Sequence, residues 1–306
     1  MAFTATDVKT LREMTGVGMM DCKKALSATD GDMDKAVEWL REKGMAASAK
    51  KAGRIAAEGM AYAAVIDGIG VVVEVNAETD FVGKNEKFVE FVKGVAATVA
   101  KENPADLDAL MNAKYAGSDL SVLQQQQEMV LVIGENIKVR RFARFADGVS
   151  VAYVHAGGKI GVLVNLETNL PAEQVVTAGK DVAMQIAALN PRFWDKSQVS
   201  DDVLAEEKKI MLAQMDNDPK MAGKPAQVKE KIVMGKMNKF YAENCLLQQE
   251  FVKDNSTTVG AYLDAAAKAL GGTITFRNAV RFEKGEGIEK KQENFAAEIA
   301  SLVSGS

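Results

Sequence analysis

Histidine, cysteine and proline are scarce in this sequence, and these shortages exclude several classes of protein. His155 is the only histidine, and Cys22 and Cys245 are the only cysteines. The chain therefore lacks the ligands of a conventional zinc cluster, and we expect no disulfide framework. With 5 prolines among 306 residues and 6% aromatic side chains, the composition favours helix.

Long apolar runs and a strong charge are also missing. No apolar run approaches the about 18 residues that a membrane-spanning helix needs, and the first residues show no signal-peptide pattern. A net charge of −4 gives no electrostatic case for binding nucleic acid or membrane. With 47% hydrophobic and 26% charged residues, we expect a soluble cytoplasmic protein with more than one packing unit.

Catalytic motifs are absent as well. No phosphate-binding loop of the Gly-x-x-x-x-Gly-Lys-Ser/Thr type occurs. His155 has no evident Ser or Cys nucleophile in a known context, so a hydrogen-bonded hairpin residue is favoured over a catalytic one. We therefore predict that the chain is not an enzyme.

The most informative stretch is VVVEVNAETDFVGKN at residues 71–85. Its β-branched first half alternates apolar and polar residues around Glu74 and Asn76, which predicts a strand with one solvated face. Thr79 and Asp80 are favourable helix starts, and Phe81 opens an apolar pattern at helical spacing. One interpretation is a capping residue followed by a core phenylalanine. The other is an acid and a ring placed together for a function.

A repeat separates these interpretations. VNAETDF at residues 75–81 returns as VNLETNL at 164–170, each within a predicted β-hairpin followed by a helix. Predicted strands at 137–146 and 273–282 complete two small antiparallel sheets, so the fold class is α+β. The second copy has Asn169 and Leu170 in place of Asp80 and Phe81. An uncharged, smaller pair thus meets the structural need, and the first pair points to a function.

Helical segments flank and interrupt this core. Gly-containing breaks and capping residues predict three short helices within residues 6–43, followed by a linker or frayed helix at 44–58. Met19 and Met20 are either core residues or a partner-binding surface. The helical pattern of residues 192–239 predicts an inserted antiparallel hairpin of helices, for self-association or for binding an accessory partner. A last helix is predicted to contain Phe295, Ile299 and Leu302.

Several long motifs resemble the bacterial translation elongation factor Ts family. They are LREMTGVGMMDCKKAL at residues 11–26, EVNAETDFV at 74–82, GENI at 134–137, KIGVL at 159–163 and RFEKGEGIEK at 281–290. The resemblance covers nearly the whole chain. Two departures stand beside the second motif: Ala77, where the family often has Cys, and Gly83, where Ala is usual.

The resemblance implies a guanine-nucleotide exchange factor. Such a factor binds elongation factor Tu with GDP, disturbs its Mg²⁺ and phosphate site, promotes GDP release and stays bound until GTP arrives. Thr79, Asp80, Phe81 and Val82 would dislodge the Mg²⁺, whereas Arg12, Met19, Met20 and His155 match partner-binding positions. No cofactor or metal of its own is implied, because GDP, GTP and Mg²⁺ belong to the partner.

The resemblance also implies a domain plan. Its parts are a three-helix domain similar to ubiquitin-associated domains at 1–54, core subdomains at 55–147 and at 148–191 with 240–283, a coiled-coil or dimerisation hairpin at 192–239 and a C-terminal module at 284–306. A homodimer or a 2:2 complex stays open. The alternative function is a non-catalytic adaptor whose three-helix domain and hairpin tether other proteins.

Overall fold

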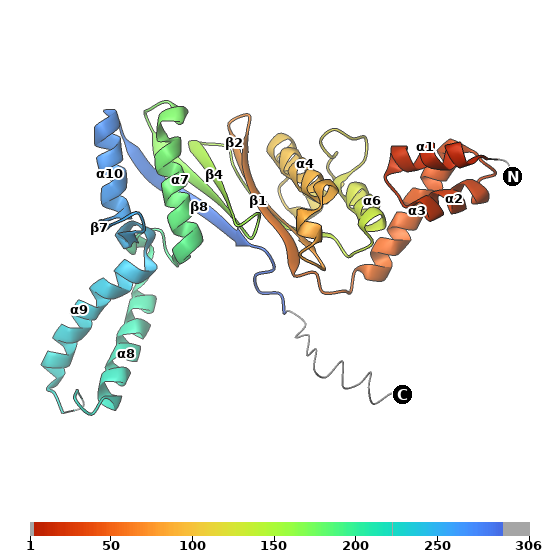
Figure 1. Cartoon of the computed structure of the whole chain (residues 1–306). Helices are drawn as coiled ribbons and strands as arrows, with labels where there is room; N and C mark the ends of the chain where they lie inside the picture. Colours follow the sequence, from red (N-terminus) through yellow and green to blue (C-terminus); the bar gives the residue numbers. More distant parts are fainter. Residues whose placement is uncertain (1–2, 222, 290–306) are drawn as a thin grey trace, which may run out of the picture.

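The computed structural model describes residues 3–221 and 223–289 of an α+β chain. N-terminal helices, two small antiparallel sheets and a helical hairpin follow one another along the molecule (Figure 1). The predicted last helix, with Phe295, Ile299 and Leu302, lies outside the described residues. No described helix is long and apolar enough to cross a membrane.

The first three helices share one small core. They are α1 (Ala5–Thr15), α2 (Met19–Ala28) and α3 (Met33–Lys51). Thr4 forms a capping box with Asp7, and Gly16 ends α1 in the left-handed conformation at a φ of 68°. The buried side chains between the helices include Leu11, Cys22, Leu26, Ala36 and Leu40.

The prediction of a linker or frayed helix at 44–58 is wrong as far as Lys51, because α3 continues to that residue and packs on the core, whereas residues 52–57 form an irregular connection. The partner of α3 is α6 (Val122–Ile133), whose Leu131 and Val132 contact the three-helix core. A Cβ at Gly44 would lie 3.1 Å from the Gln127 carbonyl oxygen, so glycine allows the two helices to cross closely. Burial against α6 supplies the stability that the composition of this segment lacks.

Each half of the core is a hairpin, a covering helix and a third strand. In the first half, β1 (Glu58–Ile66), β2 (Ile69–Ala77) and β3 (Lys138–Phe145) pair in that order. Between β2 and β3 lie α4 (Glu86–Glu102), α5 (Leu107–Asn112) and α6. The β-branched side chains Val71, Val73 and Val75 meet Phe88 and Phe91 of α4 in the core.

The second half repeats this order with a long insertion. Strands β4 (Val149–His155), β5 (Ile160–Thr168) and β8 (Ile274–Glu283) pair in that order, and α7 (Ala172–Leu189) and α10 (Val259–Leu270) cover them. The insertion holds α8 (Asp201–Asn217), α9 (Ala226–Asn244), β6 (Glu250–Phe251) and β7 (Asp254–Thr258). The predicted third strands therefore occur in both halves.

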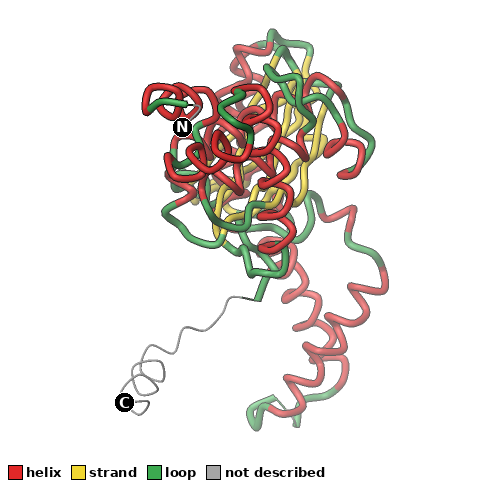
Figure 2. The backbone as a smooth tube through the Cα atoms, turned by 90° about the vertical axis from the view of Figure 1, so that its right-hand side faces the viewer, coloured by secondary structure: helices red, strands yellow, loops and turns green. Residues whose placement is uncertain are grey.

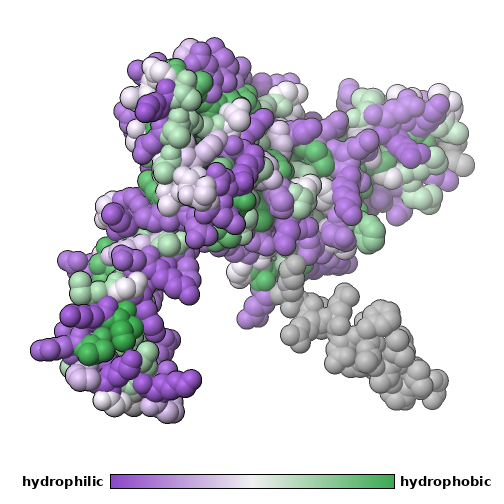
Figure 3. Space-filling model, turned by 60° about the vertical axis from the view of Figure 1, so that its left-hand side comes forward, coloured by the Kyte–Doolittle hydropathy of each residue, from purple (hydrophilic) through white to green (hydrophobic). Residues whose placement is uncertain are grey.

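The hairpin of α8 and α9 projects from the body of the molecule (Figure 2). Its own core contains Met215, Val233, Met237 and Phe240. Ile210 and Met234 remain exposed on the hairpin, where Figure 3 shows an apolar patch surrounded by hydrophilic side chains. Packing between its own helices thus holds the hairpin together.

The two sheets stack face to face, and α4 and α7 lie on their outer sides (Figure 1). Small side chains line much of this junction, including Ala61 and Ala63, beside Val72, Leu163 and Phe282. A Cβ at Gly161 would lie only 3.1 Å from the Ala61 carbonyl carbon. Small residues therefore allow close stacking of the sheets.

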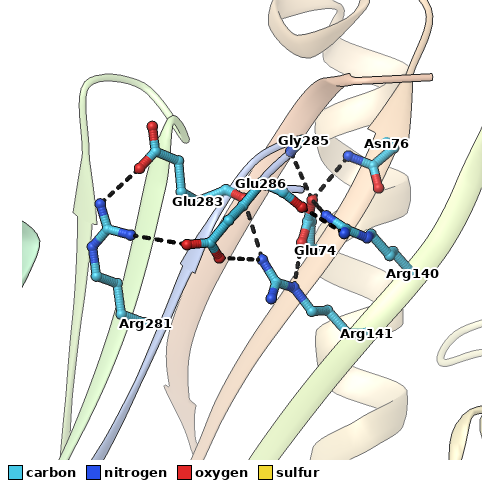
Figure 4. A network of polar contacts seen from close by, with 8 residues as sticks. All are labelled: Glu74, Asn76, Arg140, Arg141, Arg281, Glu283, Gly285 and Glu286. Atoms are coloured by element: carbon cyan, nitrogen blue, oxygen red, sulfur yellow. Dashed lines mark hydrogen bonds and ion pairs between the residues drawn. The ribbon is translucent and has the colours of Figure 1, made fainter. Parts of the chain in front are cut away.

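Glu74 and Asn76 point into this junction, so the predicted solvated face of β2 is wrong. Glu74 is fully buried, and Asn76 is 1% exposed. The Glu74 carboxylate accepts hydrogen bonds from Arg140 Nη1 at 2.9 Å, from Arg141 Nε and from Asn76 Nδ2 at 3.0 Å (Figure 4). The alternation of β2 reflects a buried polar cluster between two sheets and not contact with water.

The turn after β8 completes this cluster. The backbone N–H of Gly285 donates to Glu74 Oε1 at 2.8 Å, and Arg141 Nη2 reaches Glu286 Oε2 at 3.0 Å (Figure 4). Lys284 forms an ion pair with Glu58 at 2.6 Å. The cluster therefore ties β2 and β3 of the first half to the end of the second half.

Burial by itself raises the pKa of Glu74, but the four hydrogen bonds that its carboxylate accepts outweigh this effect and hold the pKa below its ordinary value. The folded protein thus binds the Glu74 proton more weakly than the unfolded chain does. The stabilisation is fully present above the unfolded pKa of about 4.3 and is lost as pH falls through the folded pKa.

We predict that Glu74→Gln lowers the free energy of unfolding at pH 7 by about 3 kcal/mol, because two arginines lose their buried partner. The difference from the wild type should narrow as pH falls below the unfolded pKa of about 4.3, because the unfolded wild-type chain then binds the Glu74 proton more readily than the folded protein does. Urea unfolding at pH 7 and pH 3.5 measures this, with the exposed Glu42→Gln as the control. A difference that does not change with pH would contradict the prediction.

Candidate functional site

Residues 78–81 form a turn between β2 and α4, and the predicted helix start at Thr79 and Asp80 is wrong. A short 3₁₀ turn, η1 (Val82–Lys84), comes next, and α4 begins only at Glu86. Asn85 is the capping residue, since its Oδ1 accepts from the backbone N–H of Lys87 at 3.0 Å and of Phe88 at 3.4 Å. Asn85 is an equally good cap and lies nearer to the apolar face of α4, which explains the later start.

Phe81 projects into solvent. Its side chain is 78% exposed, the largest fraction among the large apolar side chains of the described residues. Asp80 beside it is also exposed and makes no side-chain hydrogen bond to any described residue. Val82, in contrast, is buried in the core of the first half. The interpretation of Asp80 and Phe81 as a cap and a core residue is therefore wrong.

A carboxylate from another part of the chain holds this turn. Glu135, between α6 and β3, accepts from the backbone N–H of Glu78 at 3.1 Å and of Thr79 at 3.0 Å through Oε2. Its Oε1 accepts from the Thr79 hydroxyl at 2.7 Å. In the other direction, Glu78 Oε1 accepts from the backbone N–H of Asn136 at 2.6 Å. The backbone on the N-terminal side of Asp80 and Phe81 is thus fixed while their side chains stay free.

The corresponding turn of the second half is closed differently. Asn169 Oδ1 accepts from the backbone N–H of Thr273 at 2.8 Å and lies 3.2 Å from the Thr273 hydroxyl. Leu170 packs against the second core, close to Gly272. The residues that replace Asp80 and Phe81 are therefore engaged within the fold.

The start of β1 connects the first turn to the tip of the β4–β5 hairpin. A Cβ at Gly83 would lie 2.7 Å from the Gly59 carbonyl oxygen, so η1 packs directly on β1. Two residues further on, the Ala61 N–H donates to the Gly158 carbonyl at 2.8 Å. Two predicted site segments, the 79–82 turn and the hairpin tip that carries His155, therefore lean on the same few residues of β1.

His155 ends β4 and is exposed. Its Nδ1 lies 2.9 Å from the Tyr153 hydroxyl, and its carbonyl accepts from the N–H groups of Gly158 and Lys159 in the turn. These contacts fit a hydrogen-bonded hairpin residue with a free imidazole edge, as the sequence favours.

The predicted residues of the N-terminal helices are exposed as well. Met19 is 53% and Met20 65% exposed at the first turn of α2, so the interpretation of both as core residues is wrong. Arg12 is exposed on α1. The loop between these helices reaches the first half of the core, because Lys87 Nζ of α4 donates to the Gly16 carbonyl at 3.3 Å.

A cavity of about 450 Å³ lies elsewhere, between the N-terminal helices and α6. Its lining includes Met14, Arg41, Asp119 and Glu128. Burial raises the pKa of Glu128, although Arg41 forms an ion pair with it at 3.4 Å. Asp80 and Phe81 do not line this cavity and project from the surface. Such a protruding acid and ring can enter a site on another molecule but cannot enclose a substrate.

Comparison with known proteins identifies the family of this chain. Residues 78–286 match the family model described as Elongation factor TS. The chain belongs to the elongation factor Ts family. It is 50% identical to Elongation factor Ts of Trichlorobacter lovleyi, over 99% of both chains. It is 47% identical to Elongation factor Ts of Syntrophotalea carbinolica, over 99% of this chain and 100% of that one, and 45% identical to Elongation factor Ts of Magnetococcus marinus, over 100% of both.

Sequence reasoning missed the residues that hold the turn. Glu135 and Asn136 lie in one of the motifs that resemble the elongation factor Ts family, but the motif by itself indicates no role. Glu135 lies 56 residues from Thr79 along the chain, and a pairing at that separation follows only from the sheet register. The register places β3 beside β2, with Lys138 opposite Asn76, and so brings residue 135 to the turn.

We predict that the double variant Met19→Ala, Met20→Ala keeps the thermal unfolding midpoint of the wild type within a few degrees, because both side chains are exposed. Leu26→Ala is the matched control, since Leu26 is fully buried in the same small core and its loss should cost about 2–5 kcal/mol. Circular dichroism melts of both variants measure this. If the methionine double variant lost as much stability as Leu26→Ala, the two methionines would be core residues.

Proposed function

We propose that this chain is a guanine-nucleotide exchange factor of translation elongation that acts on elongation factor Tu. The supporting observation is that Phe81 is exposed beside Asp80, on a turn whose backbone is fixed by hydrogen bonds to Glu135. The chain that carries this turn belongs to the elongation factor Ts family. Exposure of an apolar ring is unfavourable in water, so its retention on a rigid turn suits insertion into a partner.

The proposed action follows from the chemistry of the pair. Phe81 enters an apolar gap next to the magnesium site of the partner and displaces the segments that close it. Asp80 brings a negative charge towards Mg²⁺ and the phosphates, which weakens the ion's hold on GDP. Thr79 and Val82 flank the pair and anchor it, one through Glu135 and one through the core.

Magnitudes indicate that the pair cannot act alone. A nucleotide bound with nanomolar affinity is held by about 12 kcal/mol. Accelerating its release by ~10⁴ requires about 5.5 kcal/mol off the barrier. Burying one phenylalanine supplies roughly 1.5–3 kcal/mol. The remainder requires further contacts, and we propose that Arg12, Met19, Met20 and His155 contribute to the partner-binding surface.

Thermodynamic linkage relates the binding of nucleotide to the binding of the factor on elongation factor Tu. A factor that weakens the affinity of the partner for nucleotide is itself bound more weakly, by the same factor, when nucleotide is present. The complex therefore persists until GTP binds and displaces the factor. We propose that the chain needs no cofactor of its own, acts in the cytoplasm, and works as a homodimer or in a 2:2 complex with elongation factor Tu.

We predict that the double variant Asp80→Asn, Phe81→Leu reduces catalysed GDP release about 10- to 100-fold, which corresponds to about 1.4–2.7 kcal/mol of lost barrier reduction. Its fold should be unchanged because both side chains are exposed. Stopped-flow release of labelled GDP from elongation factor Tu measures the rate.

The repeat supplies the control. Asn169→Asp with Leu170→Phe makes the reverse exchange at the corresponding turn and should leave the release rate near that of the wild type. If wild-type protein binds elongation factor Tu without accelerating release, the chain is an adaptor, the alternative function. If the first double variant releases GDP at the wild-type rate, Asp80 and Phe81 have no part in exchange.

A further inference from the structure

Among the described residues, Glu135 is the acidic side chain from outside the turn of Asp80 and Phe81 that accepts hydrogen bonds from it. Its carboxylate is half-buried and accepts three hydrogen bonds, all from residues 78 and 79. We propose that Glu135 is a positioning residue for nucleotide exchange, which holds the Phe81 turn in its inserting shape. This inference rests on the proposed function.

The second half of the core shows what Glu135 makes possible. There the turn is closed by Asn169, whose own side chain accepts from Thr273 just before β8. In the first half, the acceptor comes from the segment before β3 and the donors come from the turn. The hydrogen bonds to Glu135 run in the reverse direction, and the side chain of the turn that accepts from the segment before β3 is Glu78 and not Asp80. Asp80, at the position of Asn169, is thereby released from closing the turn and is free to act on a partner.

The same segment connects the turn to the N-terminal helices. Asn136 Nδ2 donates to the Arg54 carbonyl at 2.8 Å, and Lys51 Nζ donates to the Gly134 carbonyl. Arg54 in turn lies 3.4 Å from Glu78 Oε1. Residues 134–136 thus contact both the end of α3 and the turn. The backbone of the turn is therefore connected to the three-helix unit that carries Met19 and Met20.

The hydrogen bonds of Glu135 to the turn are important for inserting Phe81, because few other contacts restrain that residue. Its ring is exposed, so packing does not fix its direction. A turn free to sample several shapes would lose conformational entropy on insertion, and this loss would weaken binding at the step that releases nucleotide. Hydrogen bonds to an ionised carboxylate are about twice as strong as neutral ones, which makes Glu135 an effective clamp.

The first experiment uses the free protein. In Glu135→Ala, amide hydrogen exchange at Glu78 and Thr79 should accelerate at least about 10-fold, because both N–H groups lose their acceptor. Glu135→Gln should retain much of the protection, since an amide oxygen accepts the two N–H bonds and its nitrogen can donate to the Thr79 hydroxyl. Unchanged protection in Glu135→Ala overturns the proposal.

The second experiment measures GDP release from elongation factor Tu as a function of factor concentration. Glu135→Ala should lower the maximal rate about 10-fold and change the half-saturating concentration by a smaller factor, because other contacts still bind the partner. Glu135→Gln should recover most of the rate. Asn169→Ala, which opens the corresponding turn of the second half, should leave the maximal rate within about 2-fold of the wild type.

The outcomes separate the two proposals. If Asp80→Asn with Phe81→Leu slows release and Glu135→Ala does not, the positioning role is wrong and the exchange function stands. If the wild type does not accelerate release, the exchange function fails, and the role of Glu135 in exchange fails with it, whereas amide exchange still shows whether the clamp exists. Should Glu135→Ala melt below the assay temperature, Thr79→Val removes one donor of the clamp and is predicted to slow release in the same direction.

Discussion

The carboxylate of Glu74 is the interaction on which the two-sheet core depends. A charge buried between apolar sheets is unfavourable unless its hydrogen-bonding capacity is met. Here Arg140 and Arg141 from β3, Asn76 from β2 and the Gly285 N–H after β8 meet it. Three of these donors lie in the same sheet as Glu74, and the Gly285 N–H is the donor that comes from the second half. This contact restricts how the second sheet is placed on the first. The apolar faces make stacking favourable, and the polar cluster determines how they stack.

Because the two halves are stacked in a fixed way, their corresponding turns can take different roles. Two similar hairpin-helix units share one junction, so the second can close its turn with Asn169 and Leu170 while the first presents Asp80 and Phe81 outward. The start of β1 carries both η1 and the β4–β5 hairpin tip, through Gly59 and Ala61. A displacement of one half relative to the other would therefore move Phe81 relative to His155. A rigid stack of sheets therefore keeps a constant distance between Phe81 and His155, which lie far apart in the chain.

Much of the fold could be predicted from local pattern, and the failures have a common cause. The hairpins, α4, α7 and both third strands follow from alternation, helical spacing and the repeat. The buried face of Glu74, the length of α3 and the later start of α4 did not follow, because each depends on a partner distant in sequence or on two caps of similar strength. The exposed Asp80 and Phe81 could be singled out by comparing the two copies. Glu135 could not, since its role appears only when β3 lies beside β2.

The closing of the Glu74 cluster also has a consequence for how the protein is made. Gly285, which donates to Glu74, lies 211 residues later in the chain. Until residue 285 has been synthesised, the Glu74 carboxylate lacks one of its four donors, although β4 and β5 can already pack on the first sheet. Such long-range pairing is slow to form and leaves apolar strands uncovered during synthesis. The polar cluster between the two halves is therefore completed only after residue 285 has been synthesised.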